Sequence, residues 1–189
     1  KRFGAFTAND QVDLEIRAED RFVDPVDEDF DVVIRVNPKP DERLVGRCVL
    51  RDEQWLVAEP NAACPEPPDG TDVAVLRCVV RSPPRPDETW RVHDGRAQKT
   101  YRPIPILRLS SLPTLRDAVV AGAGAALLPR SLVGGDVAAG RLACWGWLEG
   151  PPTELWALYT SRRLVSPKVR AFVAHLADAL AVPGGTAPS

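Results

Sequence analysis

The stretch IPILRLSSLPTLRDAVVAGAGAALLP, residues 104–129, combines the patterns of a strand, a helix and a second strand. The apolar run at 104–109 predicts the first strand, and Ser110 or Ser111 provides the N-cap of the helix. The apolar stripe of this helix recurs at steps of three, four and three residues, and it consists of Leu112, Leu115, Val119 and Gly122. Residues 125–128 predict the strand that follows. The whole stretch is therefore typical of a β-α-β unit.

Residues 12–36 show the same order of elements nearer the N-terminus. Apolar and charged residues alternate over 12–17, which predicts a half-buried strand, and apolar residues at helical spacing over 20–30 predict a helix. The run DVVIRV at 31–36 is almost continuously apolar, as expected for a parallel strand that is covered on both faces. The sequence thus predicts two β-α-β units, and such units build α/β folds.

Further elements flank these two units. Residues 44–49 and 54–58 predict two more strands, with residues 52–53 in the turn between them. A last strand is expected at 155–159, and a last helix is expected to begin with Ser166 as its N-cap.

Two proline-rich breaks divide the chain. The first is EPNAACPEPPDG at 59–70, and the second is GPP at 150–152. The two breaks predict one lobe formed by residues 1–61 plus 153–189 and a second lobe formed by 62–152. The expected fold class is α/β, with two Rossmann-like lobes joined by a double crossover hinge.

The composition of the 189 residues excludes several functional classes. With 44% apolar and 26% charged residues, the chain can bury one or two ordinary cores. Its 24 Lys and Arg residues nearly balance 26 Asp and Glu residues, and a formal charge of −2 is unlike a basic nucleic-acid-binding surface. The longest apolar runs, such as 123–129, are far shorter than the roughly 20 residues of a membrane span, so no membrane contact is expected.

The cysteines point to reduced thiols rather than to a metal site or a disulfide framework. No CxxC or CxxxC pair is present among Cys48, Cys64, Cys78 and Cys144. A chain of this length holds a core without disulfides, so buried free thiols are expected, and these favour a cytoplasmic location.

Polar side chains lie at the predicted carboxyl ends of strands in both halves. Arg35 and Asn37 end or follow the strand at 31–36, and Ser110 and Ser111 begin the helix described above. In open α/β sheets, ligands bind beyond the carboxyl ends of strands, where helix N-termini offer free N–H groups and a partial positive charge. We therefore predict that these four residues bind a small anionic or polar ligand in a cleft between the lobes.

Each of these residues also has a structural explanation that the sequence leaves open. A surface ion pair would explain Arg35, a turn would explain Asn37, and helix capping would explain Ser110 and Ser111. The Gly-Ala-Gly at 122–124 is not read as a phosphate loop, because it ends a helix instead of opening one.

Four segments together resemble the effector-binding domain of LysR-type transcriptional regulators. They are DRFVDPVDEDFDVVIRV at 20–36, NPKPDERLVGRCV at 37–49, LRDAVVAGAGAALLPRSLVGGDVAAGRL at 115–142 and LWALYTSRRLVSPKVRAFVAHL at 155–176. The similarity runs in order from about residue 12 to residue 180.

The resemblance implies a bilobed fold of the type 2 periplasmic-binding-protein kind, which closes on a small effector such as a carboxylate or an aromatic acid. It implies a homodimer or tetramer in which residues 12–18 lie near the helix at 112–121 of the partner. It also implies that DNA is bound only by a separate winged helix-turn-helix domain. No such segment is present, and the chain begins with Lys1 and contains no methionine, so we expect a fragment or a processed product.

Two other functional classes are considered beside this regulatory domain. An exported solute-binding protein would share the fold and the cleft. An enzyme would need a clustered nucleophile, base or metal, and the sequence shows none, so no catalysis, no metal and no cofactor are expected. His93 and His175 have no Cys, Asp or Glu at the spacing of a metal site.

Overall fold

The computed structural model divides the chain into two compact units. The first unit combines Lys1–Arg51 with Thr153–Gly185, and the second includes Asp52–Pro152. The structure describes residues 15–17, 30–39, 44–160 and 166–180. Each unit is built around a sheet of its own, so the predicted two-lobed α/β fold class is confirmed.

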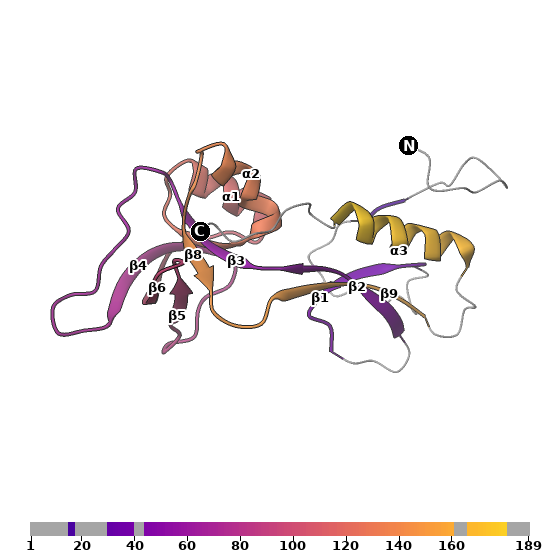
Figure 1. The fold of residues 1–189 in the computed structure, drawn as a ribbon, viewed down its shortest axis with the longest axis horizontal. Coiled ribbons are helices and arrows are strands. Elements are labelled where there is room, and N and C mark those ends of the chain that lie inside the picture. The colour runs from indigo at the N-terminus through magenta and orange to yellow at the C-terminus, as the bar shows by residue number, and fades with distance from the viewer. Residues whose placement is uncertain (1–14, 18–29, 40–43, 161–165, 181–189) are drawn as a thin grey trace. The chain divides into compact units, whose positions relative to one another are not determined.

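The first unit contains a three-stranded sheet with one helix packed against it. The strand order is β1 (Val33–Val36), β9 (Thr153–Thr160) and β2 (Leu44–Asp52), and β1 runs antiparallel to β9. Helix α3 (Pro167–Leu180) covers one face of this sheet (Figure 1). The buried residues that join the helix to the sheet are Val49, Ala157, Val173 and Ala177.

Helix α3 begins as the sequence predicts. Pro167 is its first residue, and the hydroxyl oxygen of Ser166 accepts a hydrogen bond of 3.3 Å from the backbone N–H of Val169. This bond satisfies one of the N–H groups that a helix leaves without a partner in its first turn.

Strand β1 differs from the prediction of a buried parallel strand. It lies at the end of the three-stranded sheet and pairs with β9 in the antiparallel direction, and Ile34 and Val36 are 47% and 60% exposed. An apolar run alone does not show which neighbours a strand acquires. Residues 15–17 of the predicted strand at 12–17 have no regular structure, and almost all of the predicted helix at 20–30 lies outside the described residues.

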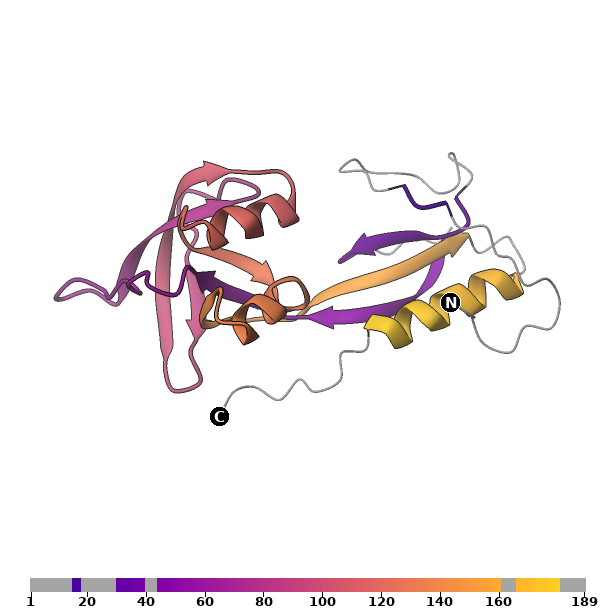
Figure 2. The ribbon, with the colours of Figure 1, turned by 90° about the horizontal axis from the view of Figure 1, so that it is seen from above.

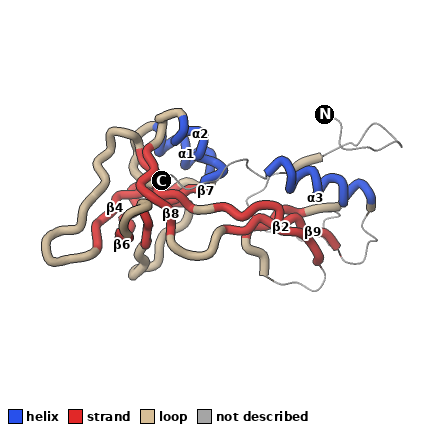
Figure 3. Tube along the Cα trace, viewed as in Figure 1, coloured by secondary structure: helices blue, strands red, loops and turns tan. Residues whose placement is uncertain are grey.

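The second unit contains a six-stranded sheet with the order β4-β6-β5-β8-β3-β7, and two helices lie on one side of it (Figures 1 and 3). Its strands are β3 (Gln54–Ala58), β4 (Val73–Val80), β5 (Trp90–His93), β6 (Gln98–Arg108), β7 (Ala126–Pro129) and β8 (Ala143–Leu148). Its helices are α1 (Leu112–Val120) and α2 (Arg130–Ala138).

This sheet curls until its two ends meet. Cys78 of β4 forms a parallel bridge with Ala125, the residue before β7, and the N–H of Val79 donates to the Ala125 carbonyl at 2.8 Å. The concave side encloses one apolar cluster, which includes Leu56, Leu76 and Tyr101. The strong bend of the strands is visible in Figure 2. A second cluster on the other face is covered by α1 and α2.

The predicted β-α-β unit at 104–129 is confirmed. Strands β4 and β6 are parallel, the Cys78 bridge makes the start of β7 parallel to β4, and α1 connects β6 to β7. Leu115 and Val119 of the predicted stripe are buried. Strand β6 is longer than predicted, because it also forms the second arm of the hairpin with β5.

The first crossing between the units differs in position from the prediction. The sequence predicts it at residues 61–62, whereas the units meet between Arg51 and Asp52. Strand β3, assigned to the first lobe, pairs with β7 and β8 of the second unit. Asp52 is the last residue of β2 and not part of a turn. Only Glu53 separates β2 from β3, so no proline or glycine in the sequence marks this crossing. The second crossing falls between Pro152 and Thr153.

Candidate functional site

The predicted serines lie where two parallel strands end together. Val80 of β4 and Arg108 of β6 are paired, and the N–H of Leu109 extends the ladder to the Val80 carbonyl at 3.0 Å. The chain then passes through Ser110 and Ser111 into α1. This is the carboxyl edge of parallel strands followed by a helix N-terminus, where α/β domains bind ligands.

Ser111 occupies the N-cap of α1 without using its side chain as a cap. Its backbone is extended, with φ −93° and ψ 125°, and its carbonyl accepts the N–H of Leu115 at 2.9 Å. Its hydroxyl makes no capping hydrogen bond, although serine is among the preferred N-cap residues. Capping therefore does not explain the Ser111 side chain, and Ser110 is exposed beside it.

Asn37 has a structural role at the end of β1. Its φ is +42°, a left-handed conformation that asparagine tolerates better than most residues. Its N–H donates to the Glu154 carbonyl and its side-chain oxygen accepts the Glu154 N–H, both at 2.8 Å. Asn37 thus extends the ladder between β1 and β9 beyond Val36.

Arg35 lies two residues before Asn37, half-buried in β1 and opposite Trp156 of β9. Leu155, Ala157 and Tyr159 of β9 pack in the α3 cluster, so the alternation of a strand places Trp156 and Arg35 on the other face.

A polar cluster surrounds the start of β9 at this same end of the sheet. Glu154 accepts hydrogen bonds of 2.9 Å from Arg51 Nε and from Trp156 Nε1. The Arg51 guanidinium holds the pKa of the Glu154 carboxyl below its usual value, so this carboxylate stays ionised at neutral pH.

The structure therefore brings Ser110 next to Ser111 in the second unit and Arg35 close to Asn37 in the first. That all four contact one ligand stays a prediction.

Sequence reasoning missed how helix α2 begins. Its N-cap is Pro129, which has no side-chain acceptor. The N–H of Arg130 donates to the Glu53 carbonyl at 2.9 Å, and the buried Asp52 carboxylate accepts the Ser131 N–H at 3.2 Å and the Ser131 hydroxyl at 2.5 Å. A carboxylate from the end of β2 thus fills the positive end of this helix.

A second buried carboxylate, Asp136, holds α2 against α1. It accepts Arg116 Nε and Nη2 at 2.6 and 2.7 Å, and Arg141 Nε at 2.7 Å. Arg116, and then Arg141, lower the pKa of the Asp136 carboxyl to about 2. A signal was present in the sequence, because Asp136 follows the apolar Val133 by three residues, a spacing that places both on one face of a helix.

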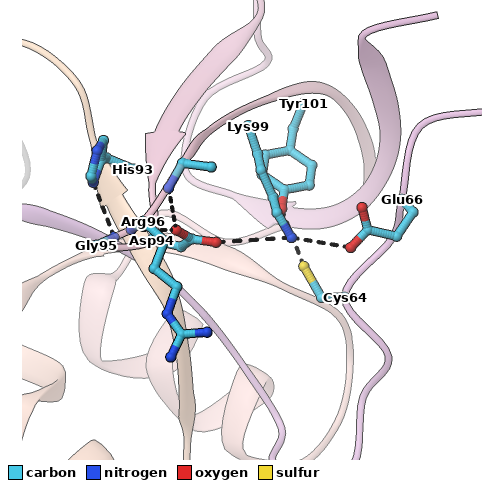
Figure 4. Close-up of polar contacts among 9 residues, drawn as sticks. Cys64, Glu66, His93, Asp94, Gly95, Arg96, Lys99 and Tyr101 are labelled. Atoms are coloured by element: carbon cyan, nitrogen blue, oxygen red, sulfur yellow. Dashed lines mark hydrogen bonds and ion pairs between the residues drawn. The ribbon is translucent and has the colours of Figure 1, made fainter.

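The proline-rich loop after β3 is held on the hairpin by the contacts in Figure 4. The Tyr101 hydroxyl lies 3.1 Å from Cys64 Sγ, and Lys99 Nζ lies 3.1 Å from Glu66 and 4.0 Å from Asp94. Burial raises the pKa of the Tyr101 hydroxyl well above its usual value, so this group is neutral. These contacts attach the loop to the hairpin.

The cysteines and histidines form no metal-binding group in the part of the chain that the structure describes. All four cysteines are free, and burial raises the pKa of the Cys78 thiol to about 11. His93 ends β5, and its Nδ1 accepts the Gly95 N–H at 3.0 Å. Within the same described ranges, no three His, Cys, Asp or Glu side chains are grouped to hold a metal, and no helix could cross a membrane.

The sequence matches the LysR substrate binding domain over residues 4–181. The HTH-type transcriptional regulator PtxR of Pseudomonas aeruginosa is 29% identical over 174 residues, which cover 90% of this chain and 55% of PtxR. The regulator DmlR of Escherichia coli is 28% identical over 169 residues, which cover 88% of this chain and 55% of DmlR. The chain thus spans about half the length of these relatives.

Solved structures show the same fold. CrgA, a LysR-type transcriptional regulator from Neisseria meningitidis, has a TM-score of 0.66 at 23% identity, covering 83% of this chain and 54% of CrgA. A variant regulatory domain of AphB from Vibrio vulnificus has a TM-score of 0.62 at 21% identity, covering 88% of this chain and 83% of that domain.

The two sheets, the double crossing and the strand-to-helix edge define a two-lobed α/β domain of the type 2 periplasmic-binding-protein class. Because the match extends over almost the whole chain, the protein belongs to the LysR substrate-binding domain family.

Proposed function

We propose that this chain is the effector-sensing part of a cytoplasmic LysR-type transcriptional regulator whose DNA-binding helix-turn-helix domain lies in the rest of the polypeptide. The match over residues 4–181 and the curated relatives, which are helix-turn-helix regulators longer than this chain, support this function. The same relatives favour it over an exported solute-binding protein. No catalytic step is part of the proposal.

The effector site that we propose is centred on Ser110 and Ser111, with Arg35 contributed by the first unit. The observation that carries it is the Ser111 hydroxyl, which stands at the N-cap of α1 without capping the helix. Asn37 remains in the proposed site as a donor through the N–H groups of its side-chain amide. The oxygen of this amide already accepts the Glu154 N–H.

The chemistry of this site favours an anionic effector such as a carboxylate or an aromatic acid. A helix N-terminus presents N–H donors and a partial positive charge, and two hydroxyls and a guanidinium add further donors. Helix α2 gives an internal precedent, because a carboxylate of the chain itself already occupies its N-terminus.

In the proposed mechanism the effector shifts a conformational equilibrium. A ligand held by both lobes favours the closed form only by its difference in affinity for the two forms, and a few kcal/mol change the populations substantially. In a dimer or tetramer, with residues 12–18 near the 112–121 helix of the partner, closure would change how the DNA-binding domains are presented.

The test is a thermal-shift screen of the full-length protein with small acids, beginning with benzoate and succinate. A ligand at about 100 times its Kd stabilises the native state by about 2.7 kcal/mol. Ser110→Ala and Arg35→Ala should each weaken a confirmed effector by about tenfold or more, because each removes a hydrogen bond to a charged group. Arg47→Ala is the matched control for Arg35→Ala, at an exposed position of β2.

Full affinity in both Ser110→Ala and Arg35→Ala would contradict the proposed site. Turnover of a small molecule that either variant abolishes would contradict the proposed function itself.

A further inference from the structure

Two buried carboxylates are not used by the proposed effector site. Asp52 and Asp136 are the charged residues buried in the described chain, with 5% and 2% of their surface exposed. Both hold helix α2, since Asp52 binds Ser131 in its first turn and Asp136 lies within it. Burying a carboxylate has a desolvation cost that its partners only offset, so stability alone does not explain such groups.

Helix α2 depends on these contacts because its own sequence forms a helix poorly. Gly134 and Gly135 lie in its interior, where glycine weakens a helix relative to alanine. A Cβ atom at either position would meet nothing within 4 Å, so packing does not require glycine. The N-cap is Pro129, and the first turn contains no acidic residue. Helix α2 is therefore stabilised mainly by contacts with residues outside the helix.

The contacts that hold α2 come from two different places. Asp52 is the last residue of β2, the strand through which the chain leaves the first unit. Asp136 holds Arg116 of α1 through two hydrogen bonds of 2.6 and 2.7 Å. Val133 of α2 and Leu115 of α1 also belong to the same buried cluster. A continuous series of contacts thus leads from the end of β2 through α2 to α1.

We infer that α2 is a coupling element between the crossing strand β2 and the start of α1, with Asp52 and Asp136 as its positioning residues. A shift of the Asp52 carboxylate removes the cap of α2, and a loosened α2 releases Arg116 and the turn of α1 that begins at Ser111. The link from α1 to a bound effector rests on the proposed function. The link from Asp52 to α1 does not.

Native-state hydrogen exchange on the full-length protein without ligand tests this link. In Asp52→Asn, the amides of α2 should exchange about tenfold faster or more, and so should the amides of Leu115 in α1 and of Ala121 at its C-cap. Adding Gly134→Ala and Gly135→Ala to the same protein should return both helices toward the wild-type rates, because alanine stabilises α2 without its cap.

Two further variants keep the test decisive. Ser131→Ala removes the hydroxyl bond and leaves the carboxylate in place, so it should give the same pattern at smaller amplitude if Asp52→Asn fails to fold. Val92→Ala, in the cluster on the other side of the sheet, provides the pattern of general destabilisation.

Faster exchange in α2 with unchanged rates in α1 would overturn the inference, and so would an Asp52→Asn pattern identical to that of Val92→Ala. Because no ligand is added, these outcomes do not depend on whether Ser110 binds an effector. The effector screen can fail while this coupling stands, and the reverse also holds.

Discussion

Helices α1 and α2 both begin after a strand, but they differ in the groups that accept hydrogen bonds from their first N–H groups. Each follows a strand of the second unit, and a proline lies near each start. At α2, a carbonyl from Glu53 and the carboxylate of Asp52 accept the first two N–H groups. At α1, Ser111 stands at the N-cap and its side chain makes no capping bond.

Under the proposed function, this difference means that one structural feature serves two purposes. The positive end of a helix attracts an anion, and the chain supplies its own anion where the helix has to be fixed. At α1, the corresponding place is left for an anion from outside under the proposed function. The two starts therefore offer a direct comparison between an internal partner and an external one.

The largest effect is expected from Asp136→Asn, which tests whether α2 depends on outside contacts. Removing one partner of a buried ion pair leaves the other charge poorly compensated, so the free energy of unfolding should fall by about 3 kcal/mol. Equilibrium urea denaturation measures this change. Asp117→Asn is the matched control, because Asp117 is exposed and binds the same Arg116 at 2.8 Å. Its loss should be below about 1 kcal/mol.

A loss below about 1 kcal/mol in Asp136→Asn, no larger than in Asp117→Asn, would mean that burial of the Asp136 pair is unimportant. In that case α2 would not need the contact with α1.

The same pair should make stability depend on pH at the acid end. Arg116 and Arg141 lower the pKa of the Asp136 carboxyl from 3.8 to about 2. The stabilisation is therefore complete above the unfolded-state pKa and is lost as the pH falls from about 4 toward 2. Urea midpoints of the wild type and Asp136→Asn should converge over this range, and other carboxylates cancel in the difference. A gap that stays constant down to pH 2.5 would contradict the assignment.

The next effect concerns the cap of α2 itself. Asp52→Asn keeps an acceptor and removes the charge at the helix start, so we expect a loss of about 1–2 kcal/mol in the free energy of unfolding. Glu53→Gln is the control, since it keeps the carbonyl that accepts the Arg130 N–H and removes the charge from an exposed ion pair with Arg130 at 3.4 Å. That variant should lose less than about 0.5 kcal/mol. Equal losses would show that the Asp52 charge does not act on the helix.

Glycine replacements should act in the opposite direction. Gly134→Ala and Gly135→Ala should each raise the free energy of unfolding by up to about 1 kcal/mol, because both sites are helical and open. Gly122→Ala, after the end of α1, should lower it by about 1 kcal/mol, since φ there is +82°. Thermal unfolding of the three variants shows whether each replacement raises or lowers the stability. A destabilised Gly134→Ala would mean that α2 is not limited by its helix propensity.

The sequence predicted the elements whose signals are local. The strand and stripe around α1 and the cap at Ser166 depend on residues a few positions apart. The first crossing was missed because β2 and β3 are separated by Glu53 alone. Its position depends on which strands pair, and pairing between distant segments has no local pattern.

In the candidate site, too, the sequence revealed residues with local signals and missed contacts between distant residues. Ser110 and Ser111 were found because a helix start has a recognisable composition. The contacts of Asn37 with Glu154 and of Asp52 with Ser131 join residues 117 and 79 positions apart, so spacing could not reveal them. That these serines contact an effector stays a prediction.

The smallest effect is expected at Ser111, and it bears most directly on the comparison. A serine that caps a helix contributes about 1 kcal/mol, so Ser166→Ala at α3 should lose about that much stability. Ser111→Ala removes no capping bond, so its loss should be under about 0.3 kcal/mol in the same urea titration. A loss equal to that of Ser166→Ala would show that Ser111 caps α1 in solution. The start of α1 would then be filled by the chain itself, as the start of α2 is, and the hydroxyl would not be available for an effector.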